Sequence, residues 1–241
     1  MIPKKLKNLL HSTLKKINYD LVKIPYGDLG KRIEIIMRYN IKTIFDVGAN
    51  IGEFAENMRD AGYKHNIISF EPRRQAFSEL LQKSKNDSNW NCVNIALGKH
   101  NGTSIINIAG NNTSSSLLEM NQIHIDVKPH SKYIGKEEIT VKKLDSVISD
   151  YIEPEEEIYL KIDTQGYEKQ ILDEAERSIS NIRVIQLEMS LIELYKGGAL
   201  IYEMVPFLES KSFFLSSIER GFHDKNSGRL LQVDGIFIRL N

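Results

Sequence analysis

A glycine-containing turn is the first place where residue types and their spacing indicate chemistry. It runs from Asp46 to Gly52 as Asp-Val-Gly-Ala-Asn-Ile-Gly, at the end of an apolar run. Gly48 lets the backbone turn sharply because it has no Cβ, and Asn50 is the non-glycine type that best tolerates left-handed dihedrals. Gly52 leaves room for the close approach of a ligand or a helix. We expect a nucleoside to lie against this turn, bound by Asp46, Gly48, Ala49, Asn50 and Gly52.

The spacing of this turn, Gly-x-Asn-x-Gly, differs from the glycine patterns that bind phosphate chains. It lacks the G-x-G-x-x-G pattern that places a pyrophosphate at a helix N-terminus, and no Lys-Ser/Thr pair follows, as a P-loop requires. This argues against NAD and ATP. A ligand with an amino-acid tail needs no phosphate-binding nest, and the carboxylate of Asp46 favours a cationic group. The turn therefore indicates S-adenosylmethionine.

A second acid lies where the ribose of such a ligand is expected. Glu71 follows the apolar run 66–70 and comes 23 residues after Gly48. An acid at about this position of a doubly wound sheet accepts hydrogen bonds from both ribose hydroxyls, and it repels a 2′-phosphate. The alternative is that Glu71 and Pro72 only begin a helix, whose dipole stabilises an acid there. We assign both residues to the cofactor site.

The end of the apolar run 92–97 is expected to contact the adenine. Ala96 and Leu97 offer a small apolar wall and backbone polar groups. Asn94 is expected to hydrogen-bond within the local turn and not to the base.

Two further acids, Asp163 and Glu188, each follow an apolar run later in the chain. If the two runs are neighbouring strands, the carboxylates meet in the cleft where α/β sheets bind ligands. Such a pair can accept the proton of an attacking hydroxyl, or hold a divalent cation with more oxygens from Gln165 or Asp234. We predict Asp163 and Glu188 as the catalytic pair, with Asp163 also contacting the cofactor. Solvated acids at the strand ends are the alternative, and no His-rich spacing demands a metal.

From residue 41 onward, short apolar runs alternate with helical patterns, which favours a mostly parallel, doubly wound α/β sheet. The expected strands are residues 43–47, 66–70, 92–97, 158–162, 184–187, 213–218 and 235–240. Helices are expected at residues 52–62 and 72–85.

The stretch 99–150 breaks this rhythm. It contains an Asn/Gly/Ser-rich section, two possible extra strands at residues 104–108 and 138–141, and a helical pattern at residues 143–151. We interpret it as an irregular insertion over one end of the sheet. The sequence leaves open whether the insertion binds substrate or is only a surface excursion.

The composition is that of an ordinary globular chain, with 241 residues, 41% hydrophobic residues and a single cysteine, Cys92. One cysteine can form neither an intrachain disulfide nor a Cys-based zinc site, so a reducing, cytoplasmic setting is expected. No apolar run approaches the roughly 20 residues that cross a bilayer, and the start of the chain lacks the apolar core of a secretory signal. We expect a soluble protein.

The formal net charge is zero, but the charge is unevenly distributed. Residues 1–24 hold six Lys and one Asp, or +5, which leaves 26 Lys and Arg against 31 Asp and Glu, or −5, in the rest. Nucleic-acid binding is therefore not expected. Apolar residues at spacings of three and four predict one amphipathic helix: Leu6, Leu9, Leu10, Leu14, Ile17 and Leu21.

This helix has three interpretations. It can pack across the main domain with its lysines in water, dock as a peripheral contact on an anionic membrane, or hold a partner. We divide the chain into a basic amphipathic helix with its connector, residues 1–40, and one domain, residues 41–241.

The sequence from about residue 41 to residue 241 resembles the FkbM family of class I S-adenosylmethionine-dependent methyltransferases. The likeness is carried by residues 46–52, Phe70-Glu-Pro72, Asn94-Ile-Ala-Leu-Gly98, Leu160-Lys-Ile-Asp-Thr-Gln-Gly166 with Glu168, Gln186-Leu-Glu188 and Asp234-Gly-Ile-Phe-Ile-Arg239. The resemblance implies a seven-stranded Rossmann-like sheet with the last strand inserted antiparallel, and the cofactor across the ends of the first strands.

The resemblance also implies O-methylation of a hydroxyl on a sugar, a glycolipid or a small natural product such as a polyketide. Two alternatives stay open at this point. One is an NAD-dependent oxidoreductase on the same nucleotide-binding fold, and the other is a non-catalytic, membrane-docked scaffold.

Overall fold

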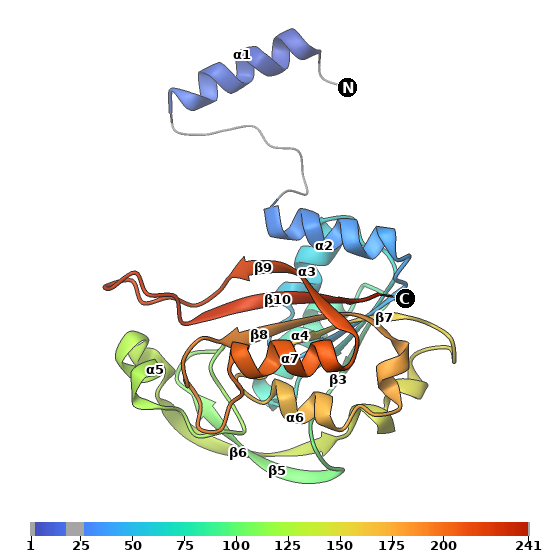
Figure 1. Ribbon diagram of the computed structural model, residues 1–241, viewed down its shortest axis with the longest axis vertical. Helices are drawn as coiled ribbons and strands as arrows, with labels where there is room; N and C mark the ends of the chain where they lie inside the picture. The colour runs from blue at the N-terminus through green and yellow to red at the C-terminus, as the bar shows by residue number, and fades with distance from the viewer. Residues whose placement is uncertain (1–2, 18–26, 241) are drawn as a thin grey trace.

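The computed structural model describes residues 3–17 and 27–240, and its centre is a seven-stranded sheet (Figure 1). The strands are β1 (Thr43–Val47), β2 (Asn66–Phe70), β3 (Trp90–Val93), β7 (Ile158–Ile162), β8 (Ile182–Ser190), β9 (Phe213–Arg220) and β10 (Gln232–Arg239). Their order is β3-β2-β1-β7-β8-β10-β9. The first five are parallel, and β10 is antiparallel to both β8 and β9. The predicted sheet, with its last strand inserted antiparallel, is confirmed.

Helices cover both faces of this sheet. One face carries α2 (Gly27–Arg38), α3 (Glu53–Asp60) and α4 (Arg74–Ser84), and the other carries α6 (Glu168–Asp173) and α7 (Ile201–Ser210). All residues of β1 and β7 are buried, as expected for parallel strands covered on both sides. Ile44 packs in the core of the first face and Phe45 in that of the second, because successive side chains of a strand point to opposite faces.

The insertion forms a second, three-stranded sheet in the order β4-β6-β5. Its elements are β4 (Ala96–Leu97), β5 (Gly102–Ala109) and β6 (Tyr133–Lys142), with the short helix α5 (Gln122–Val127) between the last two. The expected strand at residues 92–97 is therefore divided between two sheets. The amide of Asn94 donates to the carbonyls of Glu71 and Pro72, at 2.9 and 3.1 Å. This confirms its predicted place in the local turn and explains why the chain leaves the main sheet there.

The helix expected at residues 143–151 is replaced by two single 3₁₀ turns, Leu144–Ser146 and Ile148–Asp150. The carboxylate of Asp145 accepts hydrogen bonds from the backbone N–H groups of Arg177 and Ser178, at 3.0 and 2.7 Å. These long-range bonds hold the first turn against a distant loop, which the local helical pattern does not reveal.

The N-terminal part of the chain holds two helices. The first, α1 (Lys4–Lys15), coincides with the predicted amphipathic helix, whose expected continuation over residues 18–24 lies outside the described residues. The second, α2, occupies the expected connector, and its Ile35 and Ile36 are buried against the sheet. Arg32 of α2 also forms a two-pronged ion pair with Glu219 of β9. Among the described residues, no helix has the length and apolar character needed to cross a bilayer.

Gly48 is required by close packing, which makes its replacement a test of the fold. A Cβ at this position would lie 1.9 Å from the carbonyl oxygen of Asp163, and the φ of Gly48 is +74°. We therefore expect Gly48→Ala to lower the free energy of unfolding by about 2 to 5 kcal/mol, from overpacking plus left-handed strain. Gly62 has a φ of +94° but open space around it, so Gly62→Ala isolates the strain alone. Equal losses in the two variants, measured by urea unfolding, would contradict the packing argument.

Candidate functional site

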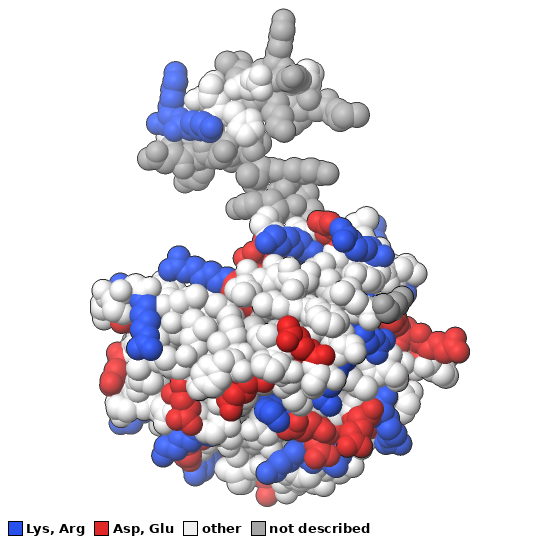
Figure 2. All heavy atoms as spheres, in the orientation of Figure 1, with Lys and Arg blue, Asp and Glu red and all other residues white. Residues whose placement is uncertain are grey.

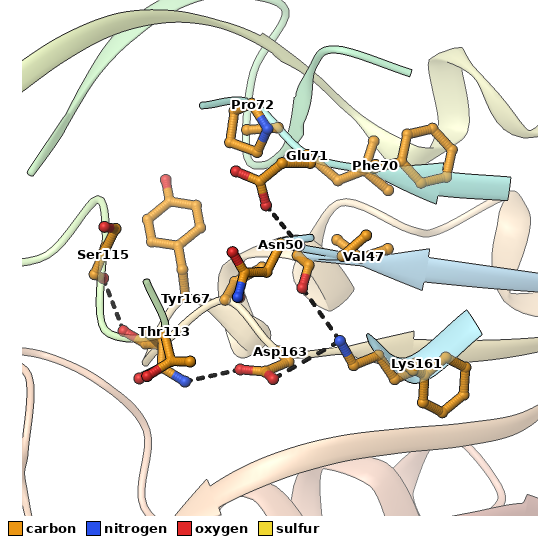
Figure 3. Close-up of a pocket in the computed structure, with 18 of the residues that line it drawn as sticks. Val47, Asn50, Phe70, Glu71, Pro72, Thr113, Ser115, Lys161, Asp163 and Tyr167 are labelled. Atoms are coloured by element: carbon orange, nitrogen blue, oxygen red, sulfur yellow. Dashed lines mark hydrogen bonds and ion pairs between the residues drawn. The ribbon is translucent and has the colours of Figure 1, made fainter. Parts of the chain in front are cut away.

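A cavity of about 300 Å³ lies at the carboxyl ends of β1, β2 and β7 (Figure 3). Its wall comes from the turns that follow β1 and β2, the end of β7 and the loop 112–117 of the insertion. Eight residues that the sequence assigned to the cofactor line it: Gly48, Ala49, Asn50, Glu71, Pro72, Ala96, Leu97 and Asp163. The structure thus brings together residues from four separate segments of the chain.

The turn after β1 is attached to the end of β2. The backbone N–H groups of Gly48 and Ala49 both donate to the carbonyl of Phe70, at 3.0 Å. Asn50 has a φ of +50°, the left-handed conformation expected for it. Its backbone N–H donates to Glu71 Oε2 at 2.8 Å. The turn and the acid that follows β2 therefore form one rigid unit in the cavity wall.

Glu71 is a buried carboxylate that lines the cavity, with 4% of its surface exposed. Its Oε1 accepts hydrogen bonds from the backbone N–H and the Nε of Arg73, at 3.0 and 3.3 Å. Burial raises the pKa of Glu71 above its usual value. The charge and hydrogen bonds of Arg73 and the N–H of Asn50 lower the pKa but only partly offset the effect of burial. These three donors occupy three of the four lone-pair sites of the carboxylate, so Oε2 can still accept a hydrogen bond from a ligand's hydroxyl.

Arg73 is a residue that the sequence analysis missed. Its Nη2 donates to the side-chain oxygen of Asn50 and to the backbone carbonyl of Asn112, both at 2.9 Å. It therefore joins the glycine turn, Glu71 and the insertion. The feature of the sequence that could have identified Arg73 as a site residue is its position directly after Glu71 and Pro72.

An apolar surface lies beside Glu71. The apolar residues that line this part of the cavity are Phe70, Pro72, Ala96, Leu97, Ile106, Leu117 and Tyr167. Ala96 and Leu97 are there as predicted, and the insertion adds Ile106 and Leu117. A flat aromatic base fits such a surface.

Two residues assigned to the cofactor do not line the cavity. Asp46 is fully buried, its Oδ1 is 3.0 Å from the ammonium of Lys161, and its Oδ2 accepts a hydrogen bond from Ser69 at 3.2 Å. Its charge is thus balanced inside the protein. A Cβ on Gly52 would lie 2.8 Å from Leu80 and 2.9 Å from Trp90. Gly52 therefore permits close packing of protein on protein, the second of the two possibilities that its sequence position left open.

Lys161 was also missed by the sequence analysis. Its Nζ lies 3.0 Å from Asp46 and donates to the carbonyl of Gly48 at 3.2 Å. It also lies 3.7 Å from Asp163 (Figure 3). Burial alone would lower the pKa of Lys161, but the charges of Asp46 and Asp163 outweigh burial and raise it. The lysine therefore stays charged and joins the ends of β1 and β7.

Acids at the strand ends form one row across the sheet. Asp234 of β10 pairs with Glu188 of β8 on one side and with Glu219 of β9 on the other. The pairing of Ile162 with Leu187 places Asp163 next to Glu188. The predicted pair is thus brought together, and the antiparallel strand extends it with two more acids.

The acids of this row differ in what they face. Asp163 and Asp234 line the cavity, whereas Glu188 does not. Glu188 Oε2 accepts hydrogen bonds from the amides of Gln165 and Gln232, at 2.9 and 2.8 Å. Glu188 thus lies behind a glutamine and outside the cavity wall, whereas Asp234 is part of that wall.

Gln165 connects the two predicted catalytic acids. Its Nε2 donates to Asp163 Oδ1 at 2.7 Å and to Glu188 Oε2 at 2.9 Å. Its Oε1 accepts a hydrogen bond from the hydroxyl of Tyr195 at 2.7 Å, and its backbone carbonyl accepts one from Ser116 at 2.7 Å. Gln165 has a left-handed backbone, with a φ of +57°, and these contacts fix its side chain. The fixed amide of Gln165 in turn orients the carboxylate of Asp163.

Burial and mutual repulsion raise the pKa values of this row. Burial, followed by the charges of Asp163 and Asp234, raises the pKa of Glu188 well above its usual value. Burial and the charge of Asp163 raise the pKa of Asp234 to about 6. Burial also raises the pKa of Glu168, behind the turn of Gln165, to about 7. Asp234 is therefore mostly ionised at neutral pH but close to its titration range.

Glu188→Gln should flatten the pH dependence of stability. A carboxyl whose folded-state pKa is raised binds its proton more tightly in the folded protein. Its contribution to stability is full below the unfolded pKa of about 4.3 and is lost as pH rises through the folded pKa. As pH rises above the unfolded pKa, we expect the variant to lose less unfolding free energy than the wild type. Glu138→Gln, at an exposed position, is the control. Denaturation curves that show the same loss of unfolding free energy in Glu188→Gln and in the wild type would contradict the raised pKa of Glu188.

The divalent cation that the sequence left open finds no ligand group. Over residues 3–17 and 27–240, no three His, Cys, Asp or Glu side chains are placed so that they could hold a metal ion. The amides of Gln165 and Gln232 occupy the space between the acids. We therefore assign no metal to this site.

The insertion reaches the site, a point that the sequence left open. Asn112, Thr113, Ser115 and Ser116 line the cavity with amide and hydroxyl groups. Figure 3 shows Thr113 and Ser115 on the side of the cavity opposite Val47 and Lys161. The irregular segment is thus a wall of the pocket.

Comparisons with solved structures find matches at low sequence identity. Methyltransferase FkbM from Methylobacillus flagellatus KT is 16% identical with a TM-score of 0.49, and the match covers 81% of this chain and 44% of that one. The chain thus spans less than half of that protein. A putative S-adenosylmethionine-dependent methyltransferase from Listeria monocytogenes is 9% identical with a TM-score of 0.49, covering 88% and 98% of the two chains. A putative rRNA methylase from Clostridium thermocellum is 11% identical with a TM-score of 0.48, covering 91% and 99%.

No curated protein matches the chain significantly in sequence. The family model of the methyltransferase FkbM domain, however, matches residues 46–215, which is well over half of the chain. This range contains the glycine turn, Glu71, Asp163 and Glu188. The chain therefore belongs to the FkbM family of S-adenosylmethionine-dependent methyltransferases.

Proposed function

We propose that the protein is an O-methyltransferase that transfers the methyl group of S-adenosylmethionine to a hydroxyl of a sugar, glycan or small natural product. One observation carries the proposal. Asp234 lines the cavity beside Asp163, and among the described residues its carboxylate takes part in no hydrogen bond. A free carboxylate at this place can accept the proton of an alcohol. The family match favours this function over the NAD-dependent oxidoreductase.

The cavity fits S-adenosylmethionine in shape and charge. Glu71 offers its carboxylate to the ribose diol, and the apolar surface beside it suits the adenine. The negative charge of Asp46 is balanced by Lys161, and that of Glu219 by Arg32. Of the other acids that face the cavity, Asp163 shares Lys161 with Asp46, at 3.7 Å, and Asp234 forms no ion pair among the described residues. A cationic sulfonium and an α-ammonium group supply the missing positive charge.

Bound S-adenosylmethionine supplies an activated methyl group on its sulfonium. An alcohol has a pKa far above 7, so it must lose its proton as its oxygen attacks. We assign Asp234 as the general base that accepts this proton, and Asp163 as the acid that orients the cofactor's amino-acid end. Alignment of the reacting oxygen in a near-attack geometry supplies several kcal/mol more. No covalent enzyme intermediate is needed.

Glu188 and Gln165 act through Asp163 in this scheme. The amide NH2 of Gln165 has two N–H donors. One donates to Asp163 and the other to Glu188. The two residues therefore position the Asp163 carboxylate and are not themselves in contact with the reacting atoms.

The polar lining of the cavity supports a hydroxyl-rich acceptor. Thr113, Ser115, Asn57 and Gln186 are among the residues that line it. These groups can both donate and accept hydrogen bonds, as the hydroxyls of a sugar or polyol do. This supports a sugar, glycolipid or hydroxylated natural product as the acceptor class.

Incubation with methyl-labelled S-adenosylmethionine tests the proposal. Separate pools of saccharides, lipid-linked sugars, hydroxylated natural products and proteins are offered, and the label is located by mass. We expect label on an oxygen of one of the first three pools. Label on protein nitrogen would contradict the proposed reaction. Binding of S-adenosylhomocysteine without transfer to any pool would support the non-catalytic scaffold.

A further inference from the structure

Three apolar side chains in or next to α1 are exposed in the folded protein. Leu6 is 47% exposed, Leu10 36% and Ile17, just beyond the helix, 61%. At 100° per residue these three side chains lie within a narrow arc of the helix. Figure 1 shows α1 apart from the sheet and from the helices that cover it. The interpretation that α1 packs across the main domain is therefore not what the structure shows for these residues.

The charge of α1 matches one kind of surface. The helix contains no acidic residue, and residues 1–24 carry six Lys against one Asp. Lys15 and Lys16 are exposed at its end. Figure 2 shows lysine side chains next to uncharged atoms on the described part of this helix, whereas both signs of charge are mixed over the body. The rest of the chain has a net charge of −5, so attraction to an anionic surface is concentrated at this end.

We propose that α1 docks the protein on an anionic lipid surface, with its leucines in the acyl boundary and its lysines among the headgroups. Its 12 residues make a helix of about 18 Å, too short to cross a bilayer but sufficient to lie in its interface. A second copy of the chain is a poorer occupant, because its α1 carries the same positive charge. The inference depends on α1 alone and not on the proposed methyl transfer.

Vesicle co-sedimentation of the full chain tests this docking. Vesicles of phosphatidylcholine alone are compared with vesicles that also contain phosphatidylglycerol, at low and high salt. We expect binding to the anionic vesicles only, with a bound fraction that falls as salt rises. Absence of binding, or equal binding to both vesicle types, would overturn the proposal.

Two variants separate the apolar contribution from the charge. Leu10→Asp and Asn8→Asp each add one negative charge to exposed positions of α1, but only the first removes an apolar side chain from the docking face. We expect Leu10→Asp to weaken binding about 10-fold or more, and Asn8→Asp to weaken it much less. Equal effects, or an effect on self-association instead of vesicle binding, would overturn the lipid assignment.

Catalysis provides the independent readout. Transfer to a soluble acceptor should be unchanged in Leu10→Asp, since Leu10 is exposed on α1 and does not line the cavity. If wild-type protein binds anionic vesicles but transfers no methyl group, the docking stands and the proposed function fails. If transfer occurs without vesicle binding, the docking fails alone.

Discussion

Asp234→Asn is expected to reduce kcat by about 100- to 10,000-fold, the usual contribution of a positioned general base. The carboxylate lines the cavity and is free to accept a proton, whereas an amide of the same size is not. Binding of S-adenosylhomocysteine should change little, because we assign the ribose and adenine contacts to Glu71 and the apolar surface beside it, not to Asp234. Single-turnover transfer and calorimetry measure the two quantities separately. Loss of affinity with an unchanged rate of transfer would remove Asp234 from the catalytic role.

The same assignment predicts the acid limb of the pH profile. The base must be ionised, and burial raises the pKa of Asp234 to about 6. Activity should therefore be lost as pH falls through about 6 and reach a plateau above about 7. Asp60→Asn, at an exposed position at the end of α3, is the matched control and should keep both the rate and the profile. The residual activity of Asp234→Asn should not show the wild-type inflection.

Glu71→Ala is expected to weaken binding of S-adenosylhomocysteine by about 1.5 to 3 kcal/mol, or roughly 10- to 150-fold, because hydrogen bonds to a charged acceptor are lost. Glu71 lines the cavity between Phe70 and Pro72 of its apolar wall, which is where the ribose must lie if the adenine occupies that wall. Isothermal titration calorimetry gives the affinity directly. An unchanged affinity would show that the ribose lies elsewhere.

Glu71 also supports the turn, so its variant needs two controls. The carboxylate accepts hydrogen bonds from the backbone of Asn50 and from Arg73, and its removal leaves an arginine without its acid. Thermal unfolding of Glu71→Ala establishes whether the fold persists at the temperature of the titration. Glu79→Ala, at an exposed position of α4, removes an equal charge away from the cavity and should leave the affinity unchanged.

Much of the frame could be predicted because it depends on local pattern. The expected runs 43–47, 66–70 and 158–162 coincide with β1, β2 and β7. Each is a short apolar segment that must be buried on both faces, and parallel strands of this kind carry their ligands at their carboxyl ends. The positions of Glu71 and Asp163 at the cavity follow from that rule alone.

The roles of neighbouring residues in the same motif depended on contacts that the motif does not contain. Asp46 and Gly48 are two residues apart, yet Asp46 is neutralised by Lys161 from β7 and only Gly48 lines the cavity. Gly52 makes room for Trp90, far along the chain. No spacing rule distinguishes a glycine that faces a ligand from one that faces a tryptophan.

The sequence by itself determined which segments become strands, where the cofactor's cleft opens and which acids stand at strand ends. The tertiary structure alone decided which acid faces the cavity. Because β10 enters the sheet antiparallel between β8 and β9, Asp234 pairs with Glu188, and because Ser116 of the insertion holds the turn of Gln165, an amide covers Glu188. Both outcomes depend on strand register and long-range hydrogen bonds, which join residues distant in sequence and leave no periodic signal in it.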